Sequence, residues 1–160
     1  MKKIILVISS LFFLLACRNG ILILKYMKMT PPSGWKIEND RIDPNTVTFK
    51  KVINKTECLI TIGSHKQSKT KTWSEIKSIL TGERGNITIK EKKEEIGENE
   101  WMTLERKTVY NHGITIHSLY LFANKNGETY NSIFVANDKV YDMVFPEFIQ
   151  LINSVKFINK

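Results

Sequence analysis

The apolar and polar positions divide the chain into one continuous apolar stretch at its start and an alternating body. Residues 4–15 are apolar except for Ser9 and Ser10, and they follow the basic pair Lys2-Lys3. A helix needs roughly 20 apolar residues to cross a hydrocarbon core, and this stretch is shorter. Its length and basic flank are typical of the hydrophobic region of a signal peptide.

The apolar stretch ends in Leu14-Leu15-Ala16-Cys17, which resembles the lipobox of bacterial lipoproteins. In that family the Cys thiol receives a diacylglyceryl group, the preceding peptide is removed, and the new amino group is usually acylated. The resemblance implies a signal peptide at 1–16 and lipidation, including palmitate, at Cys17. A core helix or a transmembrane anchor is the alternative, which the length and the terminal Ala-Cys disfavour.

The residue after the lipobox bears on the membrane that the protein occupies. Arg18 stands where an Asp retains enterobacterial lipoproteins at the inner membrane. The resemblance therefore implies a lipid-anchored protein of the cell envelope, on the outer membrane facing the periplasm if the source is Gram-negative. Membrane lipid is then a partner through acylated Cys17, and nucleic acid is not an expected partner of an exported chain.

Length and charge describe the body that remains after cleavage. Removing 16 of the 160 residues leaves 144, enough for one domain with a substantial core, so we expect a single globular domain at 17–160. The net charge of +8 falls to +6 without Lys2 and Lys3. A basic body favours an anionic membrane or an acidic partner.

The two cysteines have separate expected roles. If Cys17 carries lipid, Cys58 is left alone and no internal disulfide forms. Cys58 begins the apolar stretch 58–62. Since free cysteines are among the most buried residues, we expect an inert thiol in the core.

The body reads mainly as β-strands. Residues 18–29 indicate a first strand that pairs into the sheet, or a segment that packs beneath it. Residues 30–35 are predicted to form a turn that ends in Trp35, and we expect Trp35 to close one end of the core. The polar segment 65–71 reads as a solvated loop. Alternation and charge predict strands at 47–52, 57–63, 86–96 (a charged sheet edge), 100–110, 114–123 (central, apolar on both faces) and 128–135. Local turn signals predict turns at Gly97-Glu98-Asn99 and at 111–113, and a hairpin turn at 124–127 that contains Asn126-Gly127.

Two amphipathic helices interrupt this β pattern. Thr72 and Glu75 have the spacing of a capping box and predict a helix at 73–81 that ends at Gly82. Its expected sheet-facing stripe is Trp73, Ile76, Ile79 and Leu80.

A second helix is predicted near the end of the chain. Asn137-Asp138 is predicted to form a turn that leads into residues 140–144. Pro146 is suited to the first position of a helix, and Glu147 would then lie near the positive end of that helix. One face of this helix comprises Phe145, Phe148, Ile149 and Ile152.

Two short motifs resemble the PsbP-like fold. Pro32-Ser33-Gly34-Trp35 is similar to its P-x-G-W entry, and residues 148–157 are similar to its closing helix, F-x-x-I-x-x-S-x-x-F in style. The resemblance covers 21–157 and implies an α+β fold: a mostly antiparallel sheet flanked by amphipathic helices, an α/β/α sandwich. This fold occurs in a photosystem II extrinsic subunit, a nuclear import factor and DcrB-type lipoproteins. It implies a binding or accessory role and supplies no catalytic residues.

Candidate chemistry is sparse. His112 and His117 differ by five positions, so on one strand they would face opposite ways, and His65 is distant in sequence. Ser64-His65 is a chance adjacency, and the acidic residues stand in charged runs. The sequence contains no phosphate loop and no nucleophile elbow. We expect no catalytic residue, cofactor or metal site, and we assign Trp35, Trp73 and Trp101 to the core.

These observations leave three functional hypotheses. The first is a non-enzymatic envelope lipoprotein that binds an unidentified protein, for example an immunity protein against a periplasmic toxin. The second is a small-ligand or lipid-binding accessory protein, which needs an apolar pocket on the order of 300 Å³ between the sheet and a helix. The third, a hydrolase, needs a pocket that joins a nucleophile to a histidine, and the sequence disfavours it.

Overall fold

The computed structural model of the chain describes residues 20–39, 45–66, 72–81 and 86–158. The predicted signal peptide at 1–16, the lipidation site Cys17 and the helix stop Gly82 lie outside the described residues. They stay predictions from the sequence.

A seven-stranded antiparallel sheet forms the centre of the molecule. Its strand order is β3-β4-β5-β9-β8-β7-β6, and every neighbouring pair is antiparallel. The strands are β3 (Lys36–Asn39), β4 (Thr46–Ile53), β5 (Thr56–Lys66), β6 (Asn86–Ile96), β7 (Asn99–Val109), β8 (Thr115–Lys125) and β9 (Glu128–Asn137). The charged strand β6 lies at one edge and β8 lies inside the sheet, as the sequence predicted.

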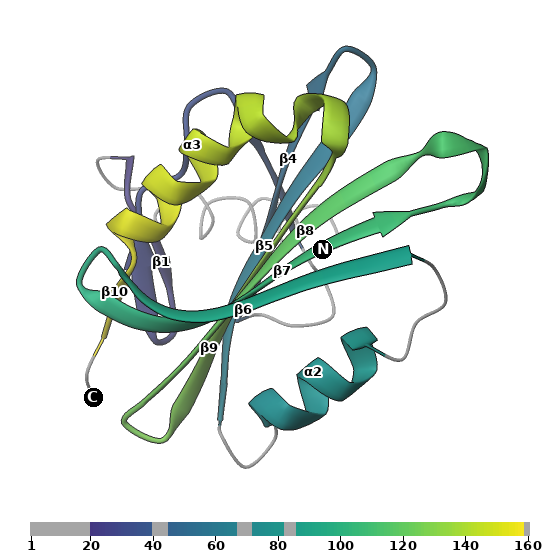
Figure 1. Cartoon of the computed structure of the whole chain (residues 1–160). Coiled ribbons are helices and arrows are strands. Elements are labelled where there is room, and N and C mark those ends of the chain that lie inside the picture. The colour runs from purple at the N-terminus through teal and green to yellow at the C-terminus, as the bar shows by residue number, and fades with distance from the viewer. Residues whose placement is uncertain (1–19, 40–44, 67–71, 82–85, 159–160) are drawn as a thin grey trace, which may run out of the picture.

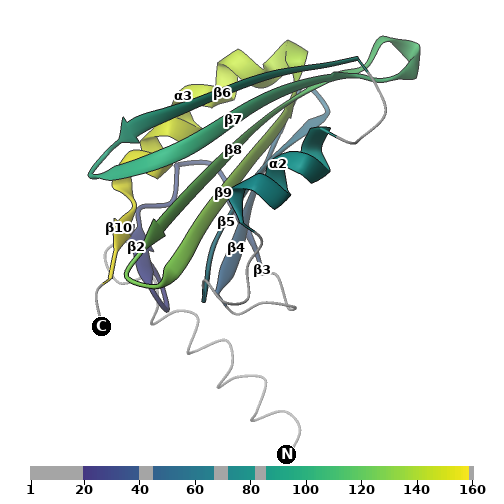
Figure 2. The same cartoon turned by 60° about the horizontal axis from the view of Figure 1, so that its bottom comes forward.

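Helices cover both faces of this sheet. Helix α3 (Asp138–Ser154) lies on one face and α2 (Trp73–Thr81) on the other, and both views show the sheet between them (Figures 1 and 2). A short 3-10 turn, η3 (Asn111–Gly113), links β7 to β8. The predicted α+β class, with a mostly antiparallel sheet between helices, is confirmed.

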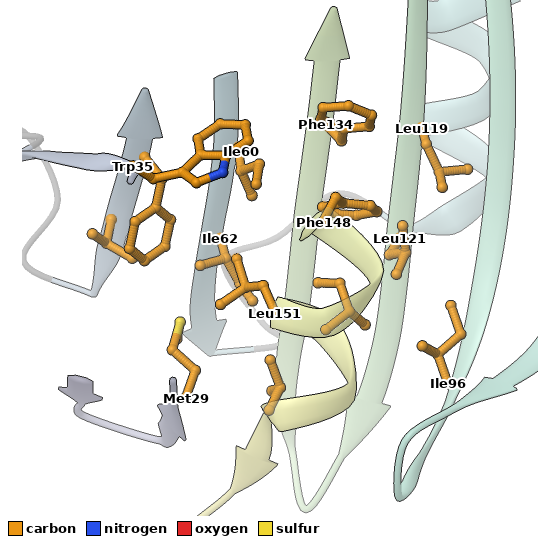
Figure 3. Close-up of a cluster of buried hydrophobic side chains, with 14 of the residues drawn as sticks. Met29, Trp35, Ile60, Ile62, Ile96, Leu119, Leu121, Phe134, Phe148 and Leu151 are labelled. Atoms are coloured by element: carbon orange, nitrogen blue, oxygen red, sulfur yellow. The ribbon is translucent and has the colours of Figure 1, made fainter. Parts of the chain in front are cut away.

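The main core lies between the sheet and α3. Register aligns Phe49, Ile60, Phe134 and Leu119 on neighbouring strands, so their side chains share one face. Phe148 of α3 stacks on Phe134 with ring centroids 4.9 Å apart. Figure 3 shows Phe148 and Leu151 of α3 pointing toward this face of the sheet.

A second, smaller sheet corrects the prediction for the start of the body. The sequence indicated one strand that joins or underlies the main sheet. Instead β1 (Leu22–Leu24) and β2 (Met27–Met29) form a hairpin, and β10 (Lys156–Phe157) pairs with β2. The small strands β3 and β10 were not predicted, because two to four residues carry too little alternation to be recognised.

The bounds of β5 also differ from the prediction. Residues 65 and 66 were assigned to a loop, yet β5 continues through them, with His65 opposite Thr129 and Lys66 opposite Glu128. A polar segment is extended here because the neighbouring strand β9 continues to pair with β5 as far as Lys66.

Helix α2 begins as predicted but packs differently. The amide of Glu75 donates to Thr72 Oγ1 over 3.3 Å, and the amide of Thr72 donates to Glu75 Oε2 over 2.6 Å, which confirms the capping box. The Trp73 ring lies 5.8 Å from the Phe122 ring, but Ile79 is 45% exposed. The predicted stripe is therefore wrong at Ile79.

Helix α3 begins eight residues earlier than the sequence indicated. Asn137 caps it, because its side chain accepts a hydrogen bond over 3.0 Å from the amide of Lys139, and Pro146 lies inside the helix rather than at its first turn. The buried face of α3 also differs from the predicted one, because Phe145 and Ile149 are only partly buried. The residues of the buried face are Val140, Tyr141, Val144, Phe148, Leu151 and Ile152.

Candidate functional site

The main sheet splits at one end into two diverging hairpins. The pairing of β7 with β8 runs from Val109 opposite Thr115 to Met102 opposite Phe122 and stops there. β7 nevertheless begins at Asn99 and β8 continues to Lys125, so residues 99–101 and 123–125 flank a gap. The tips of the β6–β7 and β8–β9 hairpins lie apart in both views (Figures 1 and 2).

A hollow of about 590 Å³ occupies this gap, and we call it the notch. Its floor is apolar and its rim is charged. The residues that line it are Lys93, Glu95, Gly97, Glu98, Asn99, Glu100, Met102, Phe122, Ala123, Asn124, Lys125 and Phe157. The notch therefore combines an apolar floor with two flanking strand edges.

Phe157 of β10 bridges the two hairpins at the floor of the notch. Its ring stacks on Tyr130 of β9 with centroids 3.7 Å apart and meets the edge of Trp101 of β7 at 5.6 Å. Lys125 lies 5.7 Å above the same ring, a cation–π contact. The C-terminal strand thus completes a site whose walls come from three distant parts of the chain.

The β6–β7 turn at the rim is held against α3. Gly97 has φ of 66°, and a Cβ at this position would lie 2.8 Å from the carbonyl oxygen of Asn153. Lys156 forms an ion pair with Glu98 over 2.8 Å, and this hydrogen bond and charge lower the pKa of Glu98 below its usual value. Glycine is required here for both the backbone conformation and the close approach.

A second, smaller hollow of about 210 Å³ lies near the start of α3 and is lined by Lys90, Glu105, Lys107 and His117. His117 Nε2 is 3.2 Å from Asp138 Oδ1, and Lys107 Nζ is 2.8 Å from the same oxygen. The hydrogen bond from Lys107 lowers the pKa of Asp138. The described residues that line it include no hydroxyl or thiol.

The three histidines do not converge. His65 lies in β5, His112 is exposed in η3 with φ of 71°, and His117 is half-buried in β8. Within the described part of the chain, no group of three or more His, Cys, Asp or Glu residues could hold a metal ion. His112 and His117 do not share a strand, because η3 turns the chain between them.

The candidate nucleophiles are buried. Ser64 and Cys58 are both 0% exposed. Burial raises the pKa of the Cys58 thiol, despite the opposing charge of Lys51. The predicted inert core cysteine therefore agrees with its surroundings, because a buried thiol with a raised pKa is a poor nucleophile.

A polar cluster that the sequence did not reveal anchors Trp35. The indole Nε1 donates to Glu147 Oε2 over 2.5 Å, and Lys51 Nζ lies 2.7 Å from Glu147 Oε1. Burial acts to raise the pKa of Glu147, but the hydrogen bonds from Lys51 and Trp35 outweigh it and the pKa lies below its usual value. Trp35 is 8% exposed and Trp101 is fully buried, as predicted, whereas Trp73 is only half-buried.

Sequence reasoning missed the notch although it found both turns beside it. Gly97-Glu98-Asn99 and the Asn126-Gly127 hairpin were recognised from local turn signals. Nothing local indicates that the two hairpins diverge or that Phe157 lies between them.

Among the described residues, no helix combines the length and the apolar character needed to cross a bilayer.

Solved structures with the same fold support the architecture. The chain is similar to LpqN of Mycobacterium tuberculosis, described as involved in cell envelope biogenesis, with a TM-score of 0.57 and 11% identity over 83% of both chains. It is similar to the cyanobacterial PsbP protein CyanoP of Synechocystis, with a TM-score of 0.54 and 16% identity over 82% of this chain and 86% of that one.

A third similar structure is PA94 of Pseudomonas aeruginosa, a putative regulator of unknown function, with a TM-score of 0.53 and 9% identity over 76% of this chain and 96% of that one. No family model and no curated protein sequence matches the chain. At these identities the similarity is one of fold, and the protein has the PsbP-like fold that its sequence motifs indicated.

Proposed function

We propose that this protein is a non-enzymatic binding module of the cell envelope, anchored through lipidated Cys17 and engaging another protein through the notch. The lipobox-like residues at the start of the chain support the anchor. The envelope role of LpqN, which has the same fold, supports the compartment. The notch supports the binding role.

The observation that carries the proposal is the pair of strand edges that flank the notch. Residues 99–101 and 123–125 continue two neighbouring strands beyond their last registered pair, Met102 with Phe122. An extended segment of a partner adds main-chain hydrogen bonds to such an edge, and apolar pockets then select its side chains. The apolar floor around Phe157 is suited to take one or two such side chains.

The non-enzymatic part of the proposal is supported by the surroundings of the reactive groups. Cys58 and Ser64 are fully buried, and His117 faces a hollow whose lining contains no hydroxyl or thiol. A general base needs its nucleophile within hydrogen-bond reach. Among the described lining residues, none offers His117 a hydroxyl or thiol within that reach.

Binding of a small ligand or lipid in the notch is the second candidate, and the volume of the hollow favours it. About 590 Å³ falls within the range of ligand sites and exceeds the threshold that this hypothesis requires. The notch lies between two hairpins, however, and not between the sheet and a helix, and its rim is charged. Those two features favour a protein segment as the occupant.

Site-specific photocrosslinking in the native cell tests the notch. A photoreactive residue at Asn124, which is exposed in the notch, is compared with one at Met143, which is 57% exposed on α3. We expect a discrete crosslinked protein from position 124 and none from position 143. Crosslinks from neither position, together with a small molecule retained in native mass spectrometry, would favour the second candidate.

The lipid anchor at Cys17 and the more specific hypothesis of an immunity protein, here called the immunity version, are tested separately. We expect radiolabelled palmitate to enter the wild-type chain and to be absent from Cys17→Ala, which should also leave the membrane fraction in a high-salt wash. A crosslinked partner that is a secreted toxin, encoded next to this protein, would support the immunity version. Crosslinking to an envelope protein without toxicity would contradict that version and leave the binding role intact.

A further inference from the structure

The small sheet presents a basic outer face. Ile23 lies opposite Lys28, and Lys28 lies opposite Lys156, so the three side chains share one face across β1, β2 and β10. All three are exposed, with Ile23 at 53%. Two lysines placed directly opposite each other repel and destabilise a sheet, so this arrangement has a cost unless an anion neutralises it.

Two further lysines and a second isoleucine lie beside the strands that carry this face. Lys25 lies in the β1–β2 turn, Lys125 ends β8, and Ile21, 37% exposed, precedes β1. Lys156 is ion-paired with Glu98, and its hydrogen bond and charge, with the charges of Lys125 and Lys28, lower the pKa of that carboxyl. We call the exposed set the anchor-side surface; it comprises Ile21, Ile23, Lys25, Lys28, Lys125 and Lys156.

Acidic groups neutralise this surface only in part. Glu98 pairs with Lys156, and the charge of Glu128 reaches Lys25. Lys28 forms no ion pair within the described part of the chain. Four lysines against these two carboxylates leave the surface positive, and its exposed isoleucines stand among the positive charges.

The position of this surface along the chain limits its distance from the proposed anchor. Gly20 is three residues from Cys17, and three residues span at most about 11 Å even when fully extended. β1 begins two residues later, at Leu22. Figure 2 shows β2, β10 and the turn between β8 and β9 at the same end of the molecule. A lipid at Cys17 would therefore bring the small sheet close to the headgroups.

We propose that the anchor-side surface docks on anionic lipid headgroups, with its lysines against lipid phosphates and Ile21 and Ile23 at the headgroup boundary. The proposal rests on the proposed lipid anchor for its biological setting. Lysines beside exposed apolar side chains are typical of surfaces that lie on a membrane interface. Docking would fix the orientation of the domain and hold the rim of the notch near the bilayer.

Vesicle binding by the unlipidated chain tests the surface independently of the anchor. The chain starts at residue 17 with Cys17→Ser and keeps every described residue. It is titrated with vesicles of phosphatidylcholine alone and with vesicles that also contain phosphatidylglycerol, at low and high salt. We expect binding only to the anionic vesicles, and weaker binding at high salt because screening shortens the reach of the lysines.

Two charge-matched variants locate the binding surface. Lys28→Gln/Lys156→Gln removes two positive charges from it, and Lys55→Gln/Lys139→Gln removes two from the β4–β5 turn and the start of α3, at the other end of the molecule (Figure 1). Each lysine near an anionic surface contributes about fivefold in affinity, so we expect the first variant to bind at least about tenfold more weakly. The second variant should lose much less.

Three results would overturn the docking proposal. They are no binding to anionic vesicles, equal binding to both kinds of vesicle, and equal losses in the two variants. Unchanged melting temperatures show that both variants are folded. A failure of the anchor would appear elsewhere, as the absence of palmitate from the wild-type chain, so the two proposals fail by different measurements.

Discussion

Trp35 Nε1 donates a hydrogen bond to Glu147 Oε2 over 2.5 Å, and so joins the start of the body to the middle of α3 across 112 positions of sequence. Lys51 of β4 completes the contact through its ion pair with the same carboxylate. The cluster ties the entry loop, the sheet and the helix together at one end of the core.

The Trp35–Glu147 link predicts non-additive losses of stability. Trp35→Phe removes the donor, and Glu147→Ala leaves the indole N–H and Lys51 without their acceptor. A hydrogen bond to a charged group contributes about 2 kcal/mol, so each variant should lower the free energy of unfolding by about that amount. Urea unfolding of the double variant should show a loss smaller than the sum.

Glu147→Gln serves as the control for this pair. It keeps an oxygen that accepts from Trp35 but loses the charge that pairs with Lys51, and it should cost less than Glu147→Ala. Strictly additive losses in the double variant would show that the contact contributes little.

Removal of the Phe157 ring should destabilise the floor of the notch. Phe157 is only half-buried but stacks on Tyr130, so Phe157→Ala should lower the free energy of unfolding by about 2 kcal/mol, less than for a fully buried ring. Lys125→Ala removes only the cation above the ring and should cost under about 1 kcal/mol. Equal effects of the two changes in urea unfolding would contradict a structural role for the stack.

The buried hydroxyl of Tyr141 should make the folded protein less stable at alkaline pH. Burial, with the charges of Glu105 and Asp142, raises the pKa of its hydroxyl above the usual 10.0. The native state therefore keeps the proton that the unfolded chain releases, and stability present below pH 10 declines as the pH rises further. The slope reaches about 1.4 kcal/mol per pH unit for one such group.

Tyr141→Phe should flatten this decline in urea unfolding between neutral and alkaline pH. Tyr110→Phe is the matched control for removal of a tyrosine hydroxyl, because Tyr110 is 50% exposed. Identical profiles for wild type and Tyr141→Phe would show that the hydroxyl titrates normally in the folded protein.

Cys58 should resist thiol reagents in the native state. It is 0% exposed and its pKa is raised by burial, so an aromatic disulfide reagent should label it only after urea unfolding. The measurement uses the Cys17→Ser chain, in which Cys58 is the sole thiol. Rapid stoichiometric labelling without denaturant would contradict the buried, inert assignment.

The features that were predicted correctly are local in sequence. Thr72 and Glu75 satisfy each other three residues apart, and Asn126-Gly127 adopts φ of 55° and 74° in a tight hairpin turn. Each depends on the intrinsic conformational preferences of a few neighbouring residues. The strand pattern of the body and the α+β class follow from the same kind of information.

The errors arose where distant contacts override a local signal. Pro146 is suited to a first helical turn, yet it lies inside α3, because Val140, Tyr141 and Val144 bury an additional helical face against the sheet. Likewise β1 and β2 are too short to be stable alone and depend on the return of β10 at Lys156–Phe157.

The sequence alone determined the antiparallel α+β class, the signal-peptide-like start and the prediction of lipidation at Cys17, because these depend on periodicity and on short contiguous motifs. Only the tertiary structure decided where β7 and β8 separate and that Phe157 lies between Trp101 and Tyr130. Tertiary packing also brought the segments that carry Lys25, Lys28, Lys125 and Lys156 to the same end of the molecule. Such sites depend on which segments meet, and that is determined by the burial of the whole core and not by any local preference.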